Sequence, residues 1–385
     1  MDELRVERGG WQQRERRQQP APAAIRGLGT AVPQQQLTQT EIYDEILAPF
    51  LGTNRLARRI FQHTGITCRH VVVERDYYQR PRSTEARNRR YLQEALPLAE
   101  RAIARCLEDA GLQIDAVDDF IVVSCTGIDT PGLDLQLAHR LEMRPDLRRA
   151  TILGMGCYGA MPGLLRAAEA ARAGRMALLL ALEICSLHFQ PDDDSIENTV
   201  TSALFADGAA AVLVSPTNAG AADQASPQEN GSNGHAAPLT SGPYLVDFET
   251  FSDFQSLDQM SFRLTDTGFR MGLGAAVPDI LADNVGPFVD RLLARNGLER
   301  DDVDIWGVHP GSGKILDFIE GRLELEEGAL DHGRAVLCQY GNMSSPTVLF
   351  VLDEIHRHAT PRPGDRAVLM AFGPGLTLEG ALVQW

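Results

Sequence analysis

The stretch "GMGCYGAMPG", residues 154–163, joins the short apolar segment "ATILGMG" to the alanine-rich segment "LLRAAEAARAG". The apolar residues of the second segment recur at helical spacing until Gly174, whereas the first segment has the length and apolar character of a buried strand. Cys157 therefore lies between a predicted strand and the start of a predicted helix. Unpaired N–H groups and the helix dipole favour a thiolate at such a position, and the thiolate is the nucleophilic form of cysteine.

This junction belongs to an order of elements that the chain contains twice. Gly341 lies 185 positions after Gly156, and Asn342 lies 185 positions after Cys157. The first copy runs through the predicted helix "LAERAIARCLEDAGL" and the strands "VDDFIVVSCTG", "TILGMG" and "MALLLALE". The second runs through the helix "FVDRLLARNGL", the strand and turn "VDIWGVHPGSG", the segment "AVLCQYG", the helix "PTVLFVLDEIHRHA" and the strand "RAVLMAFGPG". By the repeat, "AVLCQYG" is predicted to be the strand that leads into the helix, so that Asn342, like Cys157, follows a glycine at a strand-to-helix junction. Two such repeats predict a layered α/β architecture in which the junctions at Cys157 and Asn342 face each other across a pseudo-twofold axis.

Two segments fall outside the repeats. Residues 1–23 are rich in Gln, Arg and Pro and have no apolar period, which predicts a disordered tail. Residues 217–243 contain few large apolar side chains and are expected to form a flexible insert. We therefore expect an N-terminal half at 24–216 and a C-terminal half at 244–385.

The composition excludes several classes of function. The formal net charge of −16 argues against a nucleic-acid partner and against docking on anionic lipid. No apolar run approaches the roughly 20 residues of a membrane span, and the N-terminus does not resemble a secretory signal, so we expect a cytoplasmic protein. The six cysteines are scattered without a CxxC pair, which is typical of reduced thiols and not of a zinc site. No metal is expected.

Three polar side chains follow the ends of repeated elements. His309 comes directly after a buried strand, where Pro310 and the glycines of "VHPGSG" begin a turn, and it joins Cys157 and Asn342 at the junctions. Each alone also fits a structural role, as a packed thiol, a loop histidine or a helix N-cap. Their common register in the repeat favours nucleophilic catalysis. Cys157 would be the nucleophile and acyl carrier, paired with the His309 imidazole. N–H donors of His309 and Asn342 would form an oxyanion hole.

Several motifs together resemble those of the type III polyketide synthases, the chalcone-synthase-like branch of the thiolase-fold condensing enzymes. They are "IRGLGTAVP", "GMGCYGAMPGL", "LFADGAAAVLV", "VHPGSGKILD", "YGNMSSPTVLFVLDEI" and "AFGPGLTLEGAL", and the similarity extends from about residue 24 to 385 except for the insert. The resemblance implies a homodimer of five-layered αβαβα subunits. It also implies that an acyl-CoA starter loads onto Cys157 and reacts with the enolate of decarboxylated malonyl-CoA, which His309 and Asn342 stabilise.

The resemblance also assigns positions around the reacting cysteine. Phe205 in "ALFADG" and Phe262 in "MSFRL" match the family's two gatekeeping phenylalanines. The positions that line the cavity in the family are Cys125, Thr126, Cys185, His188 and Ser344. Ser344 keeps the family's serine, whereas the other four differ from the plant enzymes in a way that favours a bacterial-type enzyme. Cys125 either forms part of the cavity wall only or takes part in catalysis. His188 either binds the growing polyketide or is an exposed loop histidine.

Basic residues are candidates for binding the phosphates of coenzyme A. Arg55, Arg58 and Arg59 lie on one side of a predicted helix, and arginine forms bidentate hydrogen bonds with phosphate. Lys314, the only lysine, follows the His309 turn and is either a phosphate ligand or a surface side chain.

We therefore predict a polyketide-forming acyltransferase without a bound cofactor, which uses CoA thioesters as substrates. It would extend an acyl-CoA starter with several malonyl-CoA units and cyclise the product to an alkylpyrone, a resorcinol or a related phenolic. Two alternatives stay open: a ketoacyl-synthase-III-like enzyme that makes a single condensation, and a non-catalytic binding or dimerisation subunit with the same fold. A degradative thiolase is disfavoured because residues 371–385 contain no second cysteine.

Overall fold

The computed structural model describes residues 23–51, 55–217 and 242–385. The predicted tail and insert lie outside these residues except for their end positions, and Ala23 already belongs to the first strand. No helix among the described residues has both the length and the apolar character that crossing a bilayer requires.

Each half of the chain contributes strands in the same topological order. In the chain order of each half, the first strand of the large sheet pairs antiparallel with the last strand. The last strand also pairs antiparallel with the strand that precedes it in the chain. The other neighbouring strands of each half are parallel. The N-terminal strands are ordered β1 (Ala23–Ala31), β7 (Asp207–Pro216), β6 (Ala177–Ile184), β4 (Asp119–Val123) and β5 (Arg148–Ile152). The C-terminal strands are ordered β8 (Tyr244–Ser252), β13 (Thr377–Gln384), β12 (Arg366–Gly373) and β11 (Ile305–Val308).

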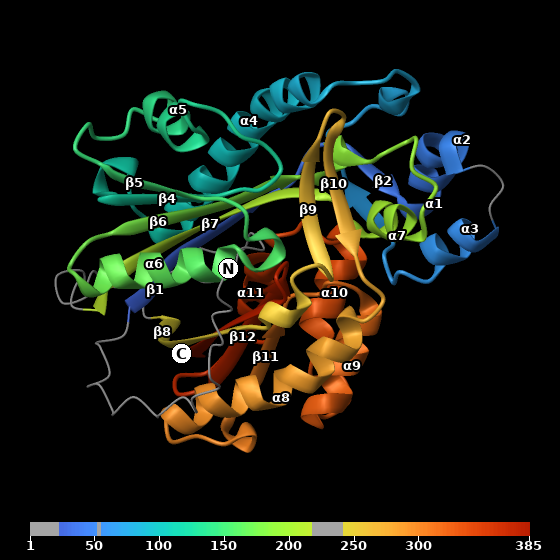
Figure 1. Cartoon of the computed structure of the whole chain (residues 1–385). Coiled ribbons are helices and arrows are strands. Elements are labelled where there is room, and N and C mark those ends of the chain that lie inside the picture. The colour runs from blue at the N-terminus through green and yellow to red at the C-terminus, as the bar shows by residue number, and fades with distance from the viewer. Residues whose placement is uncertain (1–22, 52–54, 218–241) are drawn as a thin grey trace, which may run out of the picture.

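The two sets of strands are separated by a central layer of helices. Two residue pairs between β1 and β8 join the sets into one nine-stranded sheet. The central helices α6 (Ala160–Arg172) and α11 (Thr347–His358) share a core with both sets of strands. Helices α4 (Thr84–Ala110) and α5 (Leu133–Arg140) cover the outer N-terminal face, and α8 (Val277–Arg295) and α9 (Gly313–Leu323) cover the outer C-terminal face (Figure 1). The αβαβα order predicted from the resemblance is therefore confirmed.

The alanine-rich sequence of α6 follows from its place between two layers of strands. Ala160, Ala167 and Ala168 are fully buried, and the backbone at Gly163 lies so close to the sheet that a Cβ there would come within 2.6 Å of Leu179 Cδ1. Small side chains let the helix approach the strands, so the start of α6, next to Cys157, is fixed to the sheet.

The repeat is imperfect at one position. The segment "AVLCQYG" corresponds in register to the strand before Cys157, but it forms the end of helix α10 (Asp331–Tyr340). The prediction of a strand there is wrong because Gly333, Val336 and Leu337 are buried at helical spacing, so that one side of the helix packs inward. Among the described residues, the C-terminal half consequently contributes four strands to the large sheet where the N-terminal half contributes five.

The strand before Cys157 also differs from its prediction. Residues 148–151 of β5 are all exposed, because β5 is the last strand of the N-terminal set and pairs only with β4. Its outer edge is therefore open to solvent in the described protomer.

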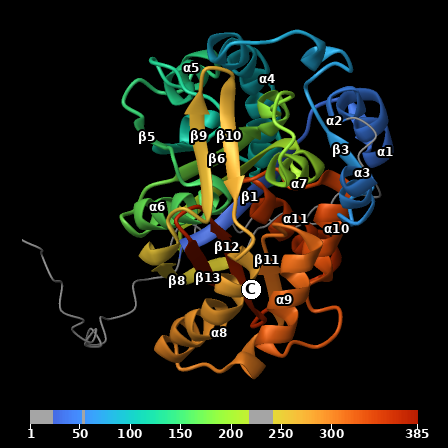
Figure 2. The same cartoon turned by 45° about the vertical axis from the view of Figure 1, so that its right-hand side comes forward.

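The remaining elements surround one end of the sheet. A hairpin of β9 (Met260–Thr265) and β10 (Gly268–Leu273) runs beside α7 (Ile196–Leu204) toward α4 (Figure 2). The other elements are β2 (Gln36–Thr38), β3 (Cys68–His70), α1 (Gln39–Glu41), a π-helical turn (Ile42–Leu47), α2 (Ala48–Leu51) and α3 (Arg55–Gln62).

Candidate active site

A cavity of about 610 Å³ lies where the two halves meet. Its wall includes the turn before α6, the turn after β11, the loop after α10, helix α7 and the β9–β10 hairpin. Cys157, His309 and Asn342 all line it. The convergence expected from the repeat is therefore present, although the junction at Asn342 follows a helix and not a strand.

Cys157 lies in a tight turn between β5 and α6. Gly154 and Gly156 have φ angles of 74° and 64°, which favour glycine, and a 3₁₀ turn at Gly156–Tyr158 leads into α6. Gly373 on β12 faces this turn, and a Cβ there would lie 3.3 Å from the Cys157 amide nitrogen. Glycines on both sides thus let the cysteine backbone approach the C-terminal half.

His309 directly continues strand β11. Its backbone N–H donates to Met370 O at 2.8 Å, and Pro310 then ends the strand. The imidazole is fully buried and its edge faces the Phe372 ring at a centroid distance of 5.6 Å. Neither ring nitrogen has a hydrogen-bond partner among the described residues. Buried polar atoms are seldom left unpaired, so the free nitrogens indicate a group that binds a ligand in the cavity.

Asn342 is held by backbone and side chain. Its N–H donates to Leu204 O at 2.9 Å, and its carbonyl accepts from the Ala206 N–H at 2.8 Å. The Asn342 Oδ1 accepts from the Ser344 N–H at 2.8 Å, while Nδ2 donates to Gly311 O at 3.2 Å. Because the oxygen is engaged by Ser344, the amide nitrogen is the end of the carboxamide directed to the His309 turn.

Burial dominates the protonation of the cysteine and the histidine. It raises the pKa of the Cys157 thiol to about 11, although hydrogen bonds from the Ser344 and Asn342 side chains lower it in part. It lowers the pKa of His309 to about 3. The thiolate expected from the helix N-terminus is thus opposed by desolvation. Either charge alone is disfavoured, so a thiolate and an imidazolium have to stabilise each other.

The remaining predicted cavity residues also line the wall: Phe205, Phe262, Cys125, Thr126, Cys185, His188 and Ser344. Cys125 accepts a hydrogen bond from the Gly156 N–H at 3.1 Å, so its sulfur supports the turn that carries Cys157. His188 is buried and not exposed, and both of its ring nitrogens are bonded to backbone groups. Ser344 has a φ of 61°, in the left-handed region that a serine seldom adopts.

Sequence reasoning missed Glu183, which is fully buried beside the cavity. Its Oε2 accepts from the N–H groups of Cys125 and Thr126 and from the Thr126 hydroxyl, and its Oε1 accepts from the Ser345 hydroxyl at 2.7 Å. Burial raises its pKa to about 7. One acidic residue in the otherwise apolar strand "MALLLALEI" was the available signal. Glu183 organises the loop that faces the Cys157 turn.

The basic residues divide into two groups. Lys314, on the first turn of α9, lines the cavity, with its Nζ 5.6 Å from the Phe318 ring centroid. Arg55, Arg58 and Arg59 are exposed on α3, and none of them lines the cavity. Helix α3 packs against α7, which does form part of the wall.

Comparisons with known proteins match both halves of the chain to one family. Sequence models of chalcone and stilbene synthases match residues 11–218 with their N-terminal domain and residues 253–385 with their C-terminal domain. A 1,3,6,8-tetrahydroxynaphthalene synthase of Streptomyces peucetius subsp. caesius is 34% identical, over 94% of this chain and 93% of its own length. A 3,5-dihydroxyphenylacetyl-CoA synthase of Streptomyces toyocaensis is 32% identical, over 95% of this chain and 90% of its own.

A solved structure is similar over nearly the whole chain. The crystal structure of 1,3,6,8-tetrahydroxynaphthalene synthase from Streptomyces coelicolor A3(2), described as a bacterial type III polyketide synthase, superposes with a TM-score of 0.81. It is 28% identical in sequence and covers 94% of this chain and 99% of that one.

Proposed function

Since the chain belongs to the chalcone and stilbene synthase family and is a type III polyketide synthase, we propose that Cys157, His309 and Asn342 are its catalytic residues. The observation that carries these roles is the convergence of the three side chains on one cavity, together with the unpartnered ring nitrogens of the buried His309. Family membership disfavours both the single-condensation alternative and the non-catalytic subunit.

In the loading step, Cys157 Sγ attacks the carbonyl carbon of the acyl-CoA starter. The thiol proton passes to the His309 imidazole, the bond between the carbonyl carbon and the CoA sulfur breaks, and the proton leaves with the CoA thiol. Burial disfavours each charge singly, so proton transfer creates the thiolate and the imidazolium together. The acyl group then remains on Cys157 as a thioester.

In the extension step, malonyl-CoA loses carbon dioxide and the electron pair of the broken bond forms an enolate. His309 and the Asn342 Nδ2 donate hydrogen bonds to the enolate oxygen. The enolate carbon attacks the acyl carbonyl, and the Cys157 thiolate leaves. Donors held in place by burial and by the Ser344 contact need little rearrangement as the negative charge develops.

The cavity wall favours an apolar starter. Its lining includes five buried aliphatic side chains: Ile42, Ile46, Leu47, Val71 and Val73. An acyl chain placed there removes apolar surface from water at roughly 25 cal/mol per Å². We propose an alkylpyrone, a resorcinol or a related phenolic as product, with synthesis in the cytoplasm.

Lys314 and the α3 arginines are the proposed contacts for coenzyme A. Lys314 lines the cavity, and Arg55, Arg58 and Arg59 lie on α3, which packs against the cavity-lining helix α7. The phosphates of a bound thioester would then lie between α3 and the start of α9.

The proposed function is tested by mass analysis of the products formed from malonyl-CoA and a panel of short, long and aromatic acyl-CoA starters. We expect discrete polyketides with at least two added ketide units from the preferred apolar starter. A single condensation product from every starter would instead support a ketoacyl-synthase-III-like enzyme. The absence of any product from the panel would contradict a working polyketide synthase.

We also propose a homodimer that forms through the outer edge of β5. The Arg148 N–H points inward to Asp118 O, and Ile152 O accepts from the Ser124 N–H, so the alternate residues Arg149 and Thr151 direct their backbone groups outward. Beside this edge, the side chains of Ile128 and Leu153 are 54% and 45% exposed. An unpaired strand next to exposed apolar side chains is suited to pairing with a second copy.

Replacing Thr151 by proline tests this edge. We expect size-exclusion chromatography with light scattering to give twice the protomer mass for the wild type and a dissociation constant raised at least ~10-fold for Thr151→Pro, because proline removes an outward N–H. The control is Thr151→Val, which keeps the N–H and should remain dimeric. A wild type that elutes as a monomer, or a Thr151→Pro dimer of unchanged affinity, would contradict pairing through β5.

A further inference from the structure

The β9–β10 hairpin forms part of the cavity wall but does not belong to the large sheet. Its two strands pair only with each other, and β9 carries Phe262 into the cavity wall. An isolated two-stranded hairpin has little stability of its own. The position of Phe262 therefore depends on what holds the hairpin from outside.

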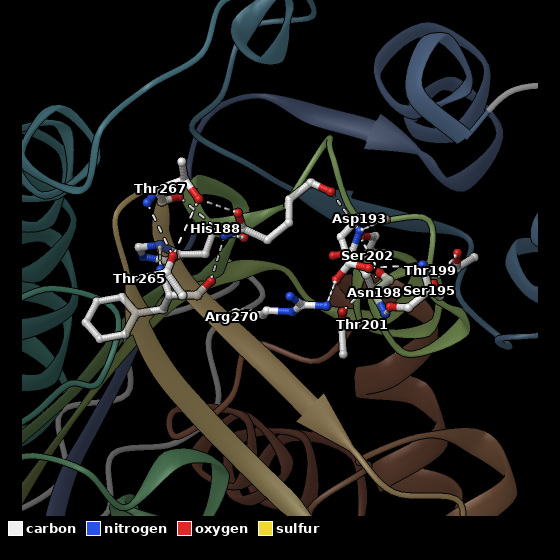
Figure 3. Close-up of polar contacts among 12 residues, drawn as sticks. His188, Asp193, Ser195, Asn198, Thr199, Thr201, Ser202, Thr265, Thr267 and Arg270 are labelled. Atoms are coloured by element: carbon white, nitrogen blue, oxygen red, sulfur yellow. Dashed lines mark hydrogen bonds and ion pairs between the residues drawn. The ribbon is translucent and has the colours of Figure 1, made fainter.

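Three side chains between β6 and α7 bind it: His188, Gln190 and Asp193, here called the clasp. Figure 3 shows two of them beside the hairpin, His188 and Asp193. Gln190 Nε2 donates to Phe269 O at 3.0 Å and to Thr267 O at 3.3 Å, and Gln190 Oε1 accepts from the Thr267 hydroxyl at 3.0 Å.

The other two members bind neighbouring positions of the hairpin. His188 Nδ1 accepts from the Phe269 N–H at 3.2 Å, and Asp193 pairs with Arg270 at 2.7 Å. The clasp thus binds three residues of the hairpin within four consecutive positions: Thr267, Phe269 and Arg270.

The clasp is itself anchored to the protein body. His188 Nε2 donates to Thr126 O at 2.7 Å, and the Thr126 N–H and hydroxyl are bound by Glu183. The Gln190 carbonyl accepts from Asn198 Nδ2 at 2.8 Å. Since His188 and Gln190 are both buried, these hydrogen bonds are shielded from water and can hold the hairpin firmly.

Aromatic contacts pass this restraint to Phe262. The Phe262 ring stacks on the Phe269 ring with centroids 4.8 Å apart and planes 11° apart. The His188 ring meets both edge-on, at 5.0 Å from Phe269 and 5.9 Å from Phe262. Gly268 lets the hairpin approach His188 closely, because a Cβ at this position would lie 2.7 Å from Arg87 Cδ and 3.0 Å from His188 Nδ1.

We propose that the clasp positions Phe262 and thereby limits the number of malonyl extensions, an inference that rests on the proposed polyketide synthesis. Gln190 does not line the cavity, so it acts as a positioning residue through the hairpin. Release of the hairpin lets Phe262 move outward, enlarges the cavity and admits a longer chain before cyclisation.

Gln190→Leu tests this role, because leucine has a similar size and removes all the side-chain hydrogen bonds. With one starter and malonyl-CoA, we expect the fraction of products that carry an additional malonyl-derived unit to rise at least ~5-fold. Acyl loading of Cys157, followed by intact mass, should stay as in the wild type. Amides of residues 260–273 should exchange hydrogen faster, while the midpoint of thermal unfolding changes little.

Two further variants make the outcome decisive. Leu264→Thr changes a mostly exposed side chain of the same hairpin outside the clasp and should keep the wild-type products and exchange. Arg270→Gln removes the ion pair to Asp193 at a half-exposed site, so it should fold even if Gln190→Leu does not, with a smaller shift in the same direction.

Folded, loadable Gln190→Leu or Arg270→Gln enzyme with wild-type product masses and wild-type exchange in 260–273 would overturn the role of the clasp. A wild-type enzyme that makes no polyketide contradicts the proposed function instead. In that case hydrogen exchange alone still decides whether the clasp holds the hairpin, and unchanged exchange in both variants rejects it.

Discussion

Replacing Cys157 by alanine is expected to abolish polyketide formation, by at least ~1000-fold in rate. Without this sulfur the proposed carrier of the acyl group between loading and extension is missing. His309 and Asn342 remain, so decarboxylation of malonyl-CoA should persist and separate loss of the nucleophile from loss of the fold. Intact-mass measurement of the acyl-enzyme, together with acetyl-CoA release from malonyl-CoA, tests both parts.

Cys185→Ala is the matched control, because Cys185 also lines the cavity and burial raises the pKa of its thiol as well. We expect this variant to load the starter and to form polyketide. An acyl-enzyme adduct that persists in Cys157→Ala and disappears in Cys185→Ala would show that the wrong thiol has been assigned.

The second large effect is expected for Asn342→Asp, which has nearly the same shape. Aspartate can still accept the Ser344 N–H, so the local backbone should be preserved. It offers a negatively charged oxygen where asparagine offers an N–H donor, and therefore repels the enolate. We expect malonyl-CoA decarboxylation to fall by ~100–1000-fold, the range measured when one oxyanion-hole donor is lost.

Loading should respond differently from decarboxylation in this variant. Cys157 and His309 carry out the proposed loading step, so acyl-enzyme formation in Asn342→Asp should fall by no more than ~10-fold. His309→Gln is the comparison: glutamine keeps a donor but cannot accept the thiol proton, and loading should fall more than in Asn342→Asp. Equal losses of loading and decarboxylation in both variants would argue against the separate roles.

The positions of the three candidate catalytic residues could be predicted because local chemistry marks them. Proline has no backbone N–H to donate, so Pro310 marks the end of the strand before it. Gly154 and Gly156, next to Cys157, adopt positive φ angles that other residues avoid. These signals act over a few residues, so the chain order alone carries them. The repeat in the sequence then predicted that the two junctions face each other, although the sequence does not show how the halves pack.

The parts that could not be predicted depend on contacts between distant segments. The seven-residue run "AVLCQYG" is short enough to fit either a buried strand or one side of a helix. In the structure its first six residues are the end of helix α10, which packs one side against the core. Both nitrogens of His188 are occupied by backbone groups, one of them 81 residues away, and no sequence pattern reports such a pairing. Glu183 was missed because nothing nearby in the sequence indicates that backbone and side-chain donors from distant segments converge on it.

The unequal strand count of the two halves bears on how the protein can assemble. At the far end of the nine-stranded sheet, β11 is mostly buried and contacts helices α10 and α11, whereas the described residues of β5, at the other end, are mostly exposed. A twofold pairing of β5 with β5 consumes that strand in both copies. Under the proposed pairing, growth would stop at two copies, and the fibre that a sheet with two exposed ends could build by adding copy after copy would not form.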